Sequence, residues 1–146
     1  LRPPMIYGKG SKGNYPMLAK LAKKLPVFPD IQNERSMLYI GNLCEFLCLL
    51  MKSGEGGIYF PQNAEYVRTS EMVRLIAKTA GHKIWITKLL NPAVWVASLV
   101  PGKVSGMVNK AFGNMVYEKE MSREFTQAYC ICSLGKSIQR TEGKDK

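Results

Sequence analysis

The sequence predicts a small α/β domain built from short strands and four to five helices. The chain has 146 residues, of which 46% are apolar, and this is enough apolar material for the core of one ordinary domain. Segments whose apolar residues recur at helical intervals alternate along the chain with short runs that favour extended structure. We therefore expect one compact unit over residues 1–140, followed by a polar, frayed tail over residues 141–146.

Five segments show the pattern of a helix with one apolar face, at residues 16–25, 42–53, 69–80, 92–99 and 134–140. Asn42 and Thr69 are expected as N-caps, because their side-chain oxygens can accept a hydrogen bond from a free N–H of the first turn. Gly54 and Gly81 are expected to end the second and third helices. The second helix has the clearest apolar stripe and is expected to face the core; the stripe comprises Leu43, Phe46, Leu47, Leu50 and Met51.

Six segments favour strands or extended structure, at residues 1–7, 26–29, 35–40, 57–61, 82–87 and 114–118. Pro3 and Pro4 confine the first of them to a strand end or an exit loop, because each proline removes a backbone donor from the ladder. Residues 8–13 and the Pro101-Gly102 dipeptide are expected to be loops.

The charge of the chain is strongly positive. Its formal net charge is +10, with 21 Lys and Arg against 11 Asp and Glu, and this balance favours an anionic partner. Six basic residues precede the first acid, Asp30. This basic segment could meet nucleic acid, a membrane surface or a phosphorylated small molecule, or it could be a solvated helix face.

The cysteines and the histidine argue against a metal site. Cys44, Cys48, Cys130 and Cys132 lack the spacing of a zinc site, and His82 is the only histidine. We expect buried free thiols, and hence a reducing, cytoplasmic location. The chain shows no signal peptide. Its most apolar stretch, residues 84–100, contains Lys88 and Pro92 and is too short to span a membrane, so we expect a soluble helix that covers a core, and no membrane partner.

Residues 8–13 read Gly-Lys-Gly-Ser-Lys-Gly and match the dinucleotide fingerprint G-x-G-x-x-G. The fingerprint requires a buried strand before it and a second strand that carries an acid for the ribose. Here two prolines precede the loop, and the one candidate acid, Asp30, follows Pro-Val-Phe-Pro. We therefore interpret the segment as a flexible connection, or as a loop that can approach an anion closely.

Several motifs occur in a characteristic order: LRPPMIYG at residues 1–8, GNYP at 13–16, PVFP at 26–29, RSMLYI at 35–40, GIYFP at 57–61 and VNKAFGNMVY at 108–117. Together they resemble the C-terminal, substrate-binding portion of extended short-chain dehydrogenases, the NAD-dependent epimerases and dehydratases of nucleotide sugars. The last motif resembles a variant found in epimerases linked to bacterial surface polysaccharides. The family's late R-P-G-D motif is reduced to Val-Pro-Gly-Lys at residues 100–103, which leaves the sugar unassigned.

The resemblance assigns roles to four residues. Arg35 would pair with the nucleotide diphosphate, because a guanidinium can bond two phosphate oxygens at once. Asn14 would hydrogen-bond the diphosphate at a helix start, Phe28 would lie against the base, and Tyr7 would lie near the sugar. The alternatives are that Tyr7 and Phe28 are core aromatics and that Arg35 is a surface ion-pair partner of Glu34 or Glu45.

The resemblance also implies what this chain lacks. The family transfers a hydride between NAD or NADP and a sugar carbon with a Tyr-x-x-x-Lys pair, and no tyrosine here has a lysine four residues later. The catalytic pair and the dinucleotide-binding domain would precede Leu1, so this chain alone is expected to bind no cofactor and to be inactive. The implied partner is a nucleoside-diphosphate sugar, with a homodimer for the full-length protein and no nucleic acid. The alternative is a non-enzymatic basic module that binds nucleic acid or another polyanion.

Overall fold

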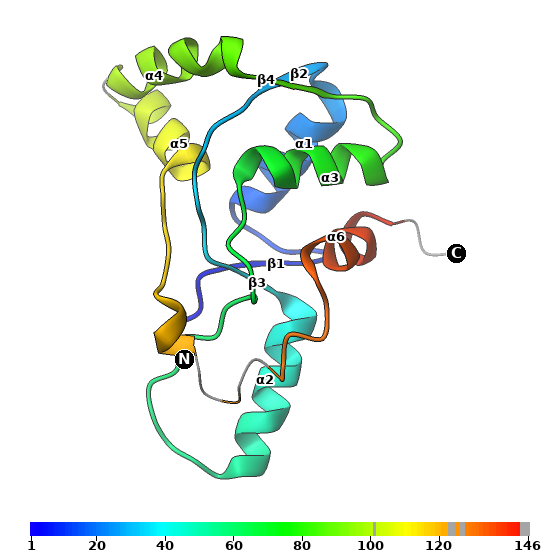
Figure 1. Cartoon of the computed structure of the whole chain (residues 1–146), viewed down its shortest axis with the longest axis vertical. Coiled ribbons are helices and arrows are strands. Elements are labelled where there is room, and N and C mark those ends of the chain that lie inside the picture. The colour runs from blue at the N-terminus through cyan, green and yellow to red at the C-terminus, as the bar shows by residue number, and fades with distance from the viewer. Residues whose placement is uncertain (101, 123–124, 126–127, 144–146) are drawn as a thin grey trace.

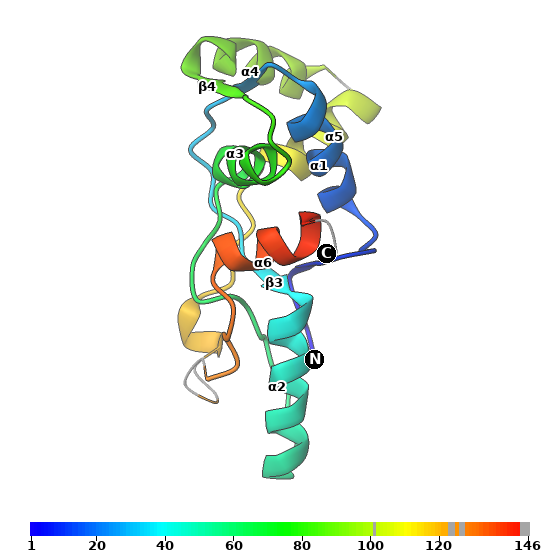
Figure 2. The ribbon, with the colours of Figure 1, turned by 90° about the vertical axis from the view of Figure 1, so that its right-hand side faces the viewer.

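The computed structural model describes residues 1–100, 102–122, 125 and 128–143, and it confirms the small α/β fold. The described part contains six α-helices and two pairs of short parallel strands. Figures 1 and 2 show an elongated molecule, with one helix at its lower end and a helical pair at its upper end.

The two strand pairs lie at different levels of the molecule (Figure 1). Strand β1 (Met5–Tyr7) runs parallel to β3 (Met37–Tyr39), and β2 (Val27–Pro29) runs parallel to β4 (Trp85–Thr87). One expected strand is wrong, because residues 57–61 form no strand. Residues 114–118, expected as a short extended segment, make a single bridge, between Met115 and Arg35.

The main core forms where three helices meet. Helix α1 (Asn14–Lys24) packs on α3 (Thr69–Thr79), and α3 packs on α6 (Leu134–Glu142). Most of the residues whose spacing predicts an inward-facing position on α1 and α3 are buried, namely Leu18, Ala22, Val73, Ile76 and Ala77, whereas Leu25 and Ala80 near the helix ends are exposed. This agreement follows from the 3.6-residue period, which gives each helix one apolar face for its neighbours.

Helix α6 runs two residues further than expected, so it includes Thr141 and Glu142, which were assigned to the tail. The carboxylate of Glu142 lies 2.5 Å from the ammonium of Lys23 on α1. This ion pair holds the end of α6 against α1, which explains why the polar sequence continues the helix. Residues 144–146 lie outside the described residues.

Helix α2 (Ile40–Ser53) differs from its prediction, because it projects from the lower end of the molecule (Figure 2). Asn42 and Phe46 are its buried residues, while Met51 is 74% exposed and Leu47 is also exposed. The expectation that the whole apolar stripe faces the core is therefore wrong. The expectation of buried thiols is also wrong for Cys44 and Cys48, since both lie exposed on this helix.

The upper end is formed by α4 (Asn91–Leu99) and α5 (Lys103–Phe112), which pack against each other (Figure 1). The sequence did not predict α5. A one-turn 3₁₀ helix, η1 (Lys88–Leu90), connects β4 to α4, and a second, η2 (Lys119–Ser122), follows α5. No residue of α4 is buried, so it does not cover a core as expected. Of the loop expected at Pro101-Gly102, Pro101 lies outside the described residues.

Candidate functional site

Arg35 is buried, with 5% of its surface exposed, and its backbone bridges Val67 on one side and Met115 on the other. Its Nη1 donates to the carbonyl oxygen of Lys110 at 2.5 Å and to that of Gly113 at 3.4 Å. These carbonyls belong to the C-terminal end of α5, where free acceptors and the helix dipole favour a cation. The guanidinium therefore caps α5.

Arg35 is also a buried cation without a counter-charge. Within the described residues it makes no ion pair, and its Nε has no hydrogen-bond partner. Burial lowers the pKa of its guanidinium, since removal from water disfavours the charged form. The alternative of a surface ion pair with Glu34 or Glu45 is therefore wrong. A buried cation with a spare donor is a group that an anion could satisfy.

Asn14 and Phe28 lie close to the same end of α5. Asn14 is the first residue of α1, and its Nδ2 donates to the Lys110 carbonyl oxygen at 3.4 Å. Phe28 is buried on β2 in the same main core as Tyr7, as its core-aromatic alternative held. Its ring centroid lies 5.7 Å from that of Phe112, the last residue of α5. Thus three of the four residues predicted from the resemblance converge on the segment from Lys110 to Gly113.

Tyr7 lies elsewhere, inside the main core at the end of β1. Its hydroxyl is 2.6 Å from Ser137 Oγ on α6 and accepts a hydrogen bond of 3.2 Å from Asn63 Nδ2. Because Ser137 Oγ donates to the Leu134 carbonyl, the hydroxyl of Tyr7 donates to Ser137. Burial raises the pKa of this phenol. Tyr7 is thus a fully bonded core tyrosine, as the alternative interpretation held.

A hollow of about 240 Å³ lies between α4 and α5. Its lining includes none of Arg35, Asn14 and Phe28, but two of its lining residues touch them: Phe112 contacts the Phe28 ring and the Gly113 carbonyl accepts from Arg35. Asn91 also lines the hollow, and its Oδ1 is a buried acceptor without a partner in the described part of the chain. The volume is below the roughly 300–1,000 Å³ typical of small-molecule pockets. The hollow is large enough for one ring of a larger ligand. Sequence reasoning missed Asn91, although its position next to Pro92 at a helix start was visible.

A network of buried amides was also missed. Asn63 Oδ1 accepts from the Tyr39 amide at 3.1 Å and from Asn42 Nδ2 at 3.0 Å. Asn42 also exchanges two hydrogen bonds with the backbone of Cys132, at 3.0 and 3.1 Å. Asn42 is therefore a buried connector inside α2, since the helix begins at Ile40, before the predicted N-cap. Thr69 is likewise inside α3; its amide donates to Asn33 Oδ1 and its hydroxyl to the Ala111 carbonyl.

The glycine-rich segment at residues 8–13 does connect a strand to a helix, β1 to α1. Strand β1 pairs with β3, whereas Asp30 follows β2, which pairs with β4 in a separate sheet. The acid is thus not on a strand beside the glycine loop, as a dinucleotide site requires. The residues present do not fit a dinucleotide cofactor, and no chemical step on this chain is assigned to one.

The described residues lack two other kinds of feature. They contain no cluster of three or more His, Cys, Asp or Glu that could hold a metal ion. They also contain no helix that is both long enough and apolar enough to cross a membrane.

Comparison with known proteins gives distant matches. No family model matches the chain. The chain is 28% identical over 132 residues to UDP-glucose 4-epimerase of Vibrio cholerae, a match that covers 85% of this chain and 39% of the relative. The crystal structure of gox2253 shares the fold with a TM-score of 0.59 and 13% identity, over 95% of this chain and 46% of that one. A candidate epimerase from Burkholderia cenocepacia gives a TM-score of 0.52 and 14% identity, over 96% and 44%.

These likenesses place the chain among proteins with an epimerase-like α/β fold. At the level of sequence it is distantly similar to a UDP-glucose 4-epimerase, and it spans about two fifths of that relative's length. The expected resemblance is thereby supported at the level of epimerase-like proteins.

Proposed function

We propose that this chain forms the nucleotide-sugar-binding part of an NAD-dependent epimerase, most similar to UDP-sugar 4-epimerases and acting in surface polysaccharide synthesis. The observation that carries the proposal is the unmatched guanidinium of Arg35, which is buried beside the end of α5 with a free Nε. A diphosphate supplies the oxygens that this group lacks.

The surroundings of Arg35 support this ligand. The amide of Asn14 is half-buried at the start of α1, where the helix dipole favours an anion. The hollow between α4 and α5 offers the Phe112 ring as an apolar wall and Asn91 Oδ1 as an acceptor for an N–H of the base. In this arrangement the chain holds the base and the diphosphate.

The rest of the enzyme would cover the lower end of the molecule. Along α2 an exposed stripe runs through Ile40, Cys44, Leu47, Cys48 and Met51, at the i, i+4, i+7, i+8, i+11 spacing of one helix face. We propose that a dinucleotide-binding domain packs on this stripe and supplies NAD or NADP and the Tyr-x-x-x-Lys pair. Without that domain the chain binds ligand but does not epimerise it.

The proposal is tested by ligand-observed saturation-transfer NMR with UDP-glucose. The hollow is small and open, so we expect an affinity in the millimolar range, about −4 kcal/mol, with saturation strongest on the uracil protons. Arg35→Gln should reduce the transfer several-fold. Asn14→Ala provides a second variant at a half-buried position, should Arg35→Gln fail to fold.

Arg2→Gln is the matched control, because it removes the same charge from an exposed residue in the basic segment. The competing function is a basic module for nucleic acid, which would lose affinity steeply with salt through counterion release. Titration with a single-stranded oligonucleotide at low and high salt separates the two. Three results together would reject the proposal. The oligonucleotide would bind with a steep salt dependence, Arg2→Gln and Arg35→Gln would weaken that binding equally, and UDP-glucose would show no saturation transfer.

A further inference from the structure

The upper end of the molecule exposes an unusual concentration of apolar side chains. We define the apolar apex as six exposed side chains of β4, η1, α4 and the residue after α4, namely Trp85, Leu89, Trp95, Val96, Leu99 and Val100. Trp85 is 78% exposed, Leu89 is 87% exposed and Trp95 is 65% exposed. Because α4 buries none of its residues, the packing of this chain does not explain its apolar composition.

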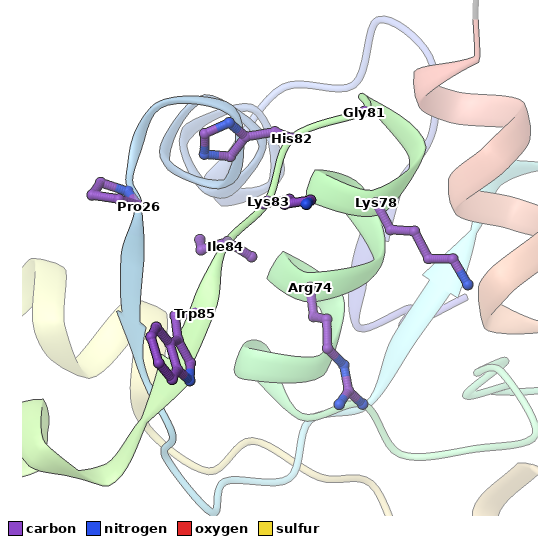
Figure 3. Close-up of a pocket in the computed structure, with 8 residues that line it drawn as sticks. All are labelled: Pro26, Arg74, Lys78, Gly81, His82, Lys83, Ile84 and Trp85. Carbon is purple, nitrogen blue, oxygen red and sulfur yellow. The ribbon is translucent and has the colours of Figure 1, made fainter.

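The charge around the apolar apex is predominantly positive, although one acid lies beside it: Asp30, at the end of β2, donates its amide to the Thr87 carbonyl and accepts from Asn91 Nδ2 at its own carbonyl. Between Glu71 and Glu118 the sequence contains no acidic residue, and it contains six basic ones: Arg74, Lys78, Lys83, Lys88, Lys103 and Lys110. A basic hollow lies directly beside Trp85, lined by Arg74, Lys78, His82 and Lys83. Figure 3 shows Arg74 and Lys78 projecting from α3 on one side of this hollow and Trp85 from β4 on the other.

We propose that the apolar apex docks on an anionic lipid surface. Exposed tryptophans and aliphatic side chains flanked by lysines are the composition of interfacial segments, in which the apolar groups enter the headgroup boundary and the cations meet lipid phosphates. The basic hollow beside Trp85 would take a headgroup phosphate. This mode of contact requires no spanning helix. It departs from the sequence-based expectation of no membrane partner, which considered only a membrane span.

Two other occupants fit less well. A second copy of the chain would bring the same mainly basic surface against itself, and like charges across an interface oppose association. The α2 stripe, in contrast, lies at the opposite end of the molecule (Figure 1) and has charges of both signs nearby, at Glu45, Lys52 and Glu55. The charge of the apolar apex therefore distinguishes it from a surface for another protein domain. The lipid-docking inference does not depend on the proposed function.

The test uses the intrinsic fluorescence of the chain, because its two tryptophans are Trp85 and Trp95. The probes are vesicles of phosphatidylcholine alone and of phosphatidylcholine mixed with phosphatidylglycerol, each with and without brominated acyl chains. We expect a blue shift of the emission and quenching by brominated lipid on the mixed vesicles, and little response on the neutral ones.

Variants then test the residues involved. Leu89→Glu and Lys88→Glu should each lower the vesicle partition constant by about tenfold or more. Met51→Glu is the matched control on α2, since Met51 is 74% exposed, and it should partition like the wild type. All these side chains are exposed, so circular dichroism should show unchanged folding.

Several outcomes would overturn the inference. One is unshifted tryptophan emission at saturating anionic lipid. Another is binding that Met51→Glu weakens as much as Leu89→Glu does. A blue shift that depends on protein concentration without lipid would assign the apolar apex to self-association, and one produced by an oligonucleotide alone would assign it to nucleic acid.

Discussion

The guanidinium of Arg35 lies 2.5 Å from the carbonyl oxygen of Lys110, and this hydrogen bond ties the end of α5 to the segment before β3. The backbone reinforces the link, since the amide of Ser36 donates to the Met115 carbonyl at 2.8 Å and the amide of Glu34 donates to Asn114 Oδ1 at 3.0 Å. The hydrogen bond from Arg35 Nη1 to the Lys110 carbonyl positions α5 and leaves Arg35 Nε without a partner. The same residue can therefore support the fold and meet a ligand.

Binding of a nucleoside diphosphate should stabilise the chain through Arg35. At a free UDP concentration about ten times Kd, linkage predicts about 1.4 kcal/mol of stabilisation, which raises Tm by roughly 3–6 °C for a domain of this size. Arg35→Lys keeps the charge but loses the planar fork, so its shift should be much smaller. Differential scanning fluorimetry with UDP measures the effect, and an equal shift in both proteins would contradict a role for the guanidinium fork.

Asn42→Ala should be strongly destabilising, although Asn42 lies on a projecting helix. The substitution leaves the Cys132 backbone amide and carbonyl without their partners inside the protein, and each lost buried bond costs about 1–3 kcal/mol. We expect a loss of about 2–4 kcal/mol in the free energy of unfolding, measured with urea. Asn109→Ala is the control, because its amide makes one exposed contact of 3.5 Å, and it should change stability by less than about 0.5 kcal/mol.

The chain should unfold at alkaline pH. Burial raises the pKa of Tyr7, Tyr15 and Tyr129, whereas in the unfolded chain these phenols ionise near pH 10. The folded state then holds protons that the unfolded state releases, so this stability is fully present below pH 10 and is lost as pH rises above it.

Phenolate absorbance and circular dichroism, followed together against pH, measure this effect. Tyr7, Tyr15 and Tyr129 should ionise only as the dichroism is lost. Tyr7→Phe should reduce the number of tyrosines that ionise with unfolding by one and cost about 1 kcal/mol. Ionisation of all seven tyrosines in a fully folded chain would contradict the prediction.

Thiol reactivity should divide the four cysteines into two pairs. Cys44 and Cys48 are exposed on α2, whereas Cys132 is buried and Cys130 is half-buried with its pKa raised by burial. Since the thiolate is the reactive form, an aromatic disulfide reagent should modify two thiols rapidly and the other two only on unfolding. The double variant Cys44→Ser, Cys48→Ser should abolish the rapid phase. Persistence of that phase would place an exposed thiol on the 130–132 segment.

Helix positions could be predicted where local chemistry decides them. The apolar period of α1 and α3 fixes their buried faces, and the prolines before β1 fix its short length, because both effects act within a few residues. Helix α5 was missed because its sequence contains Gly106 and its end is stabilised from a distance, by Arg35 and by the Thr69 hydroxyl bonded to the Ala111 carbonyl. A local sequence pattern cannot indicate hydrogen-bond partners that come from distant segments.

The sequence by itself determined the fold class, the faces of α1 and α3, the positive charge and the resemblance that singled out Arg35, Asn14 and Phe28. The tertiary structure alone decided that these three lie near the end of α5, that Phe28 and Tyr7 are both core aromatics, and that Asn42 is a buried connector. It also decided that α2 and α4 expose apolar residues. The physical reason is that exposure and hydrogen-bond partnership depend on which distant segments come together, whereas periodicity and charge are properties of the chain alone.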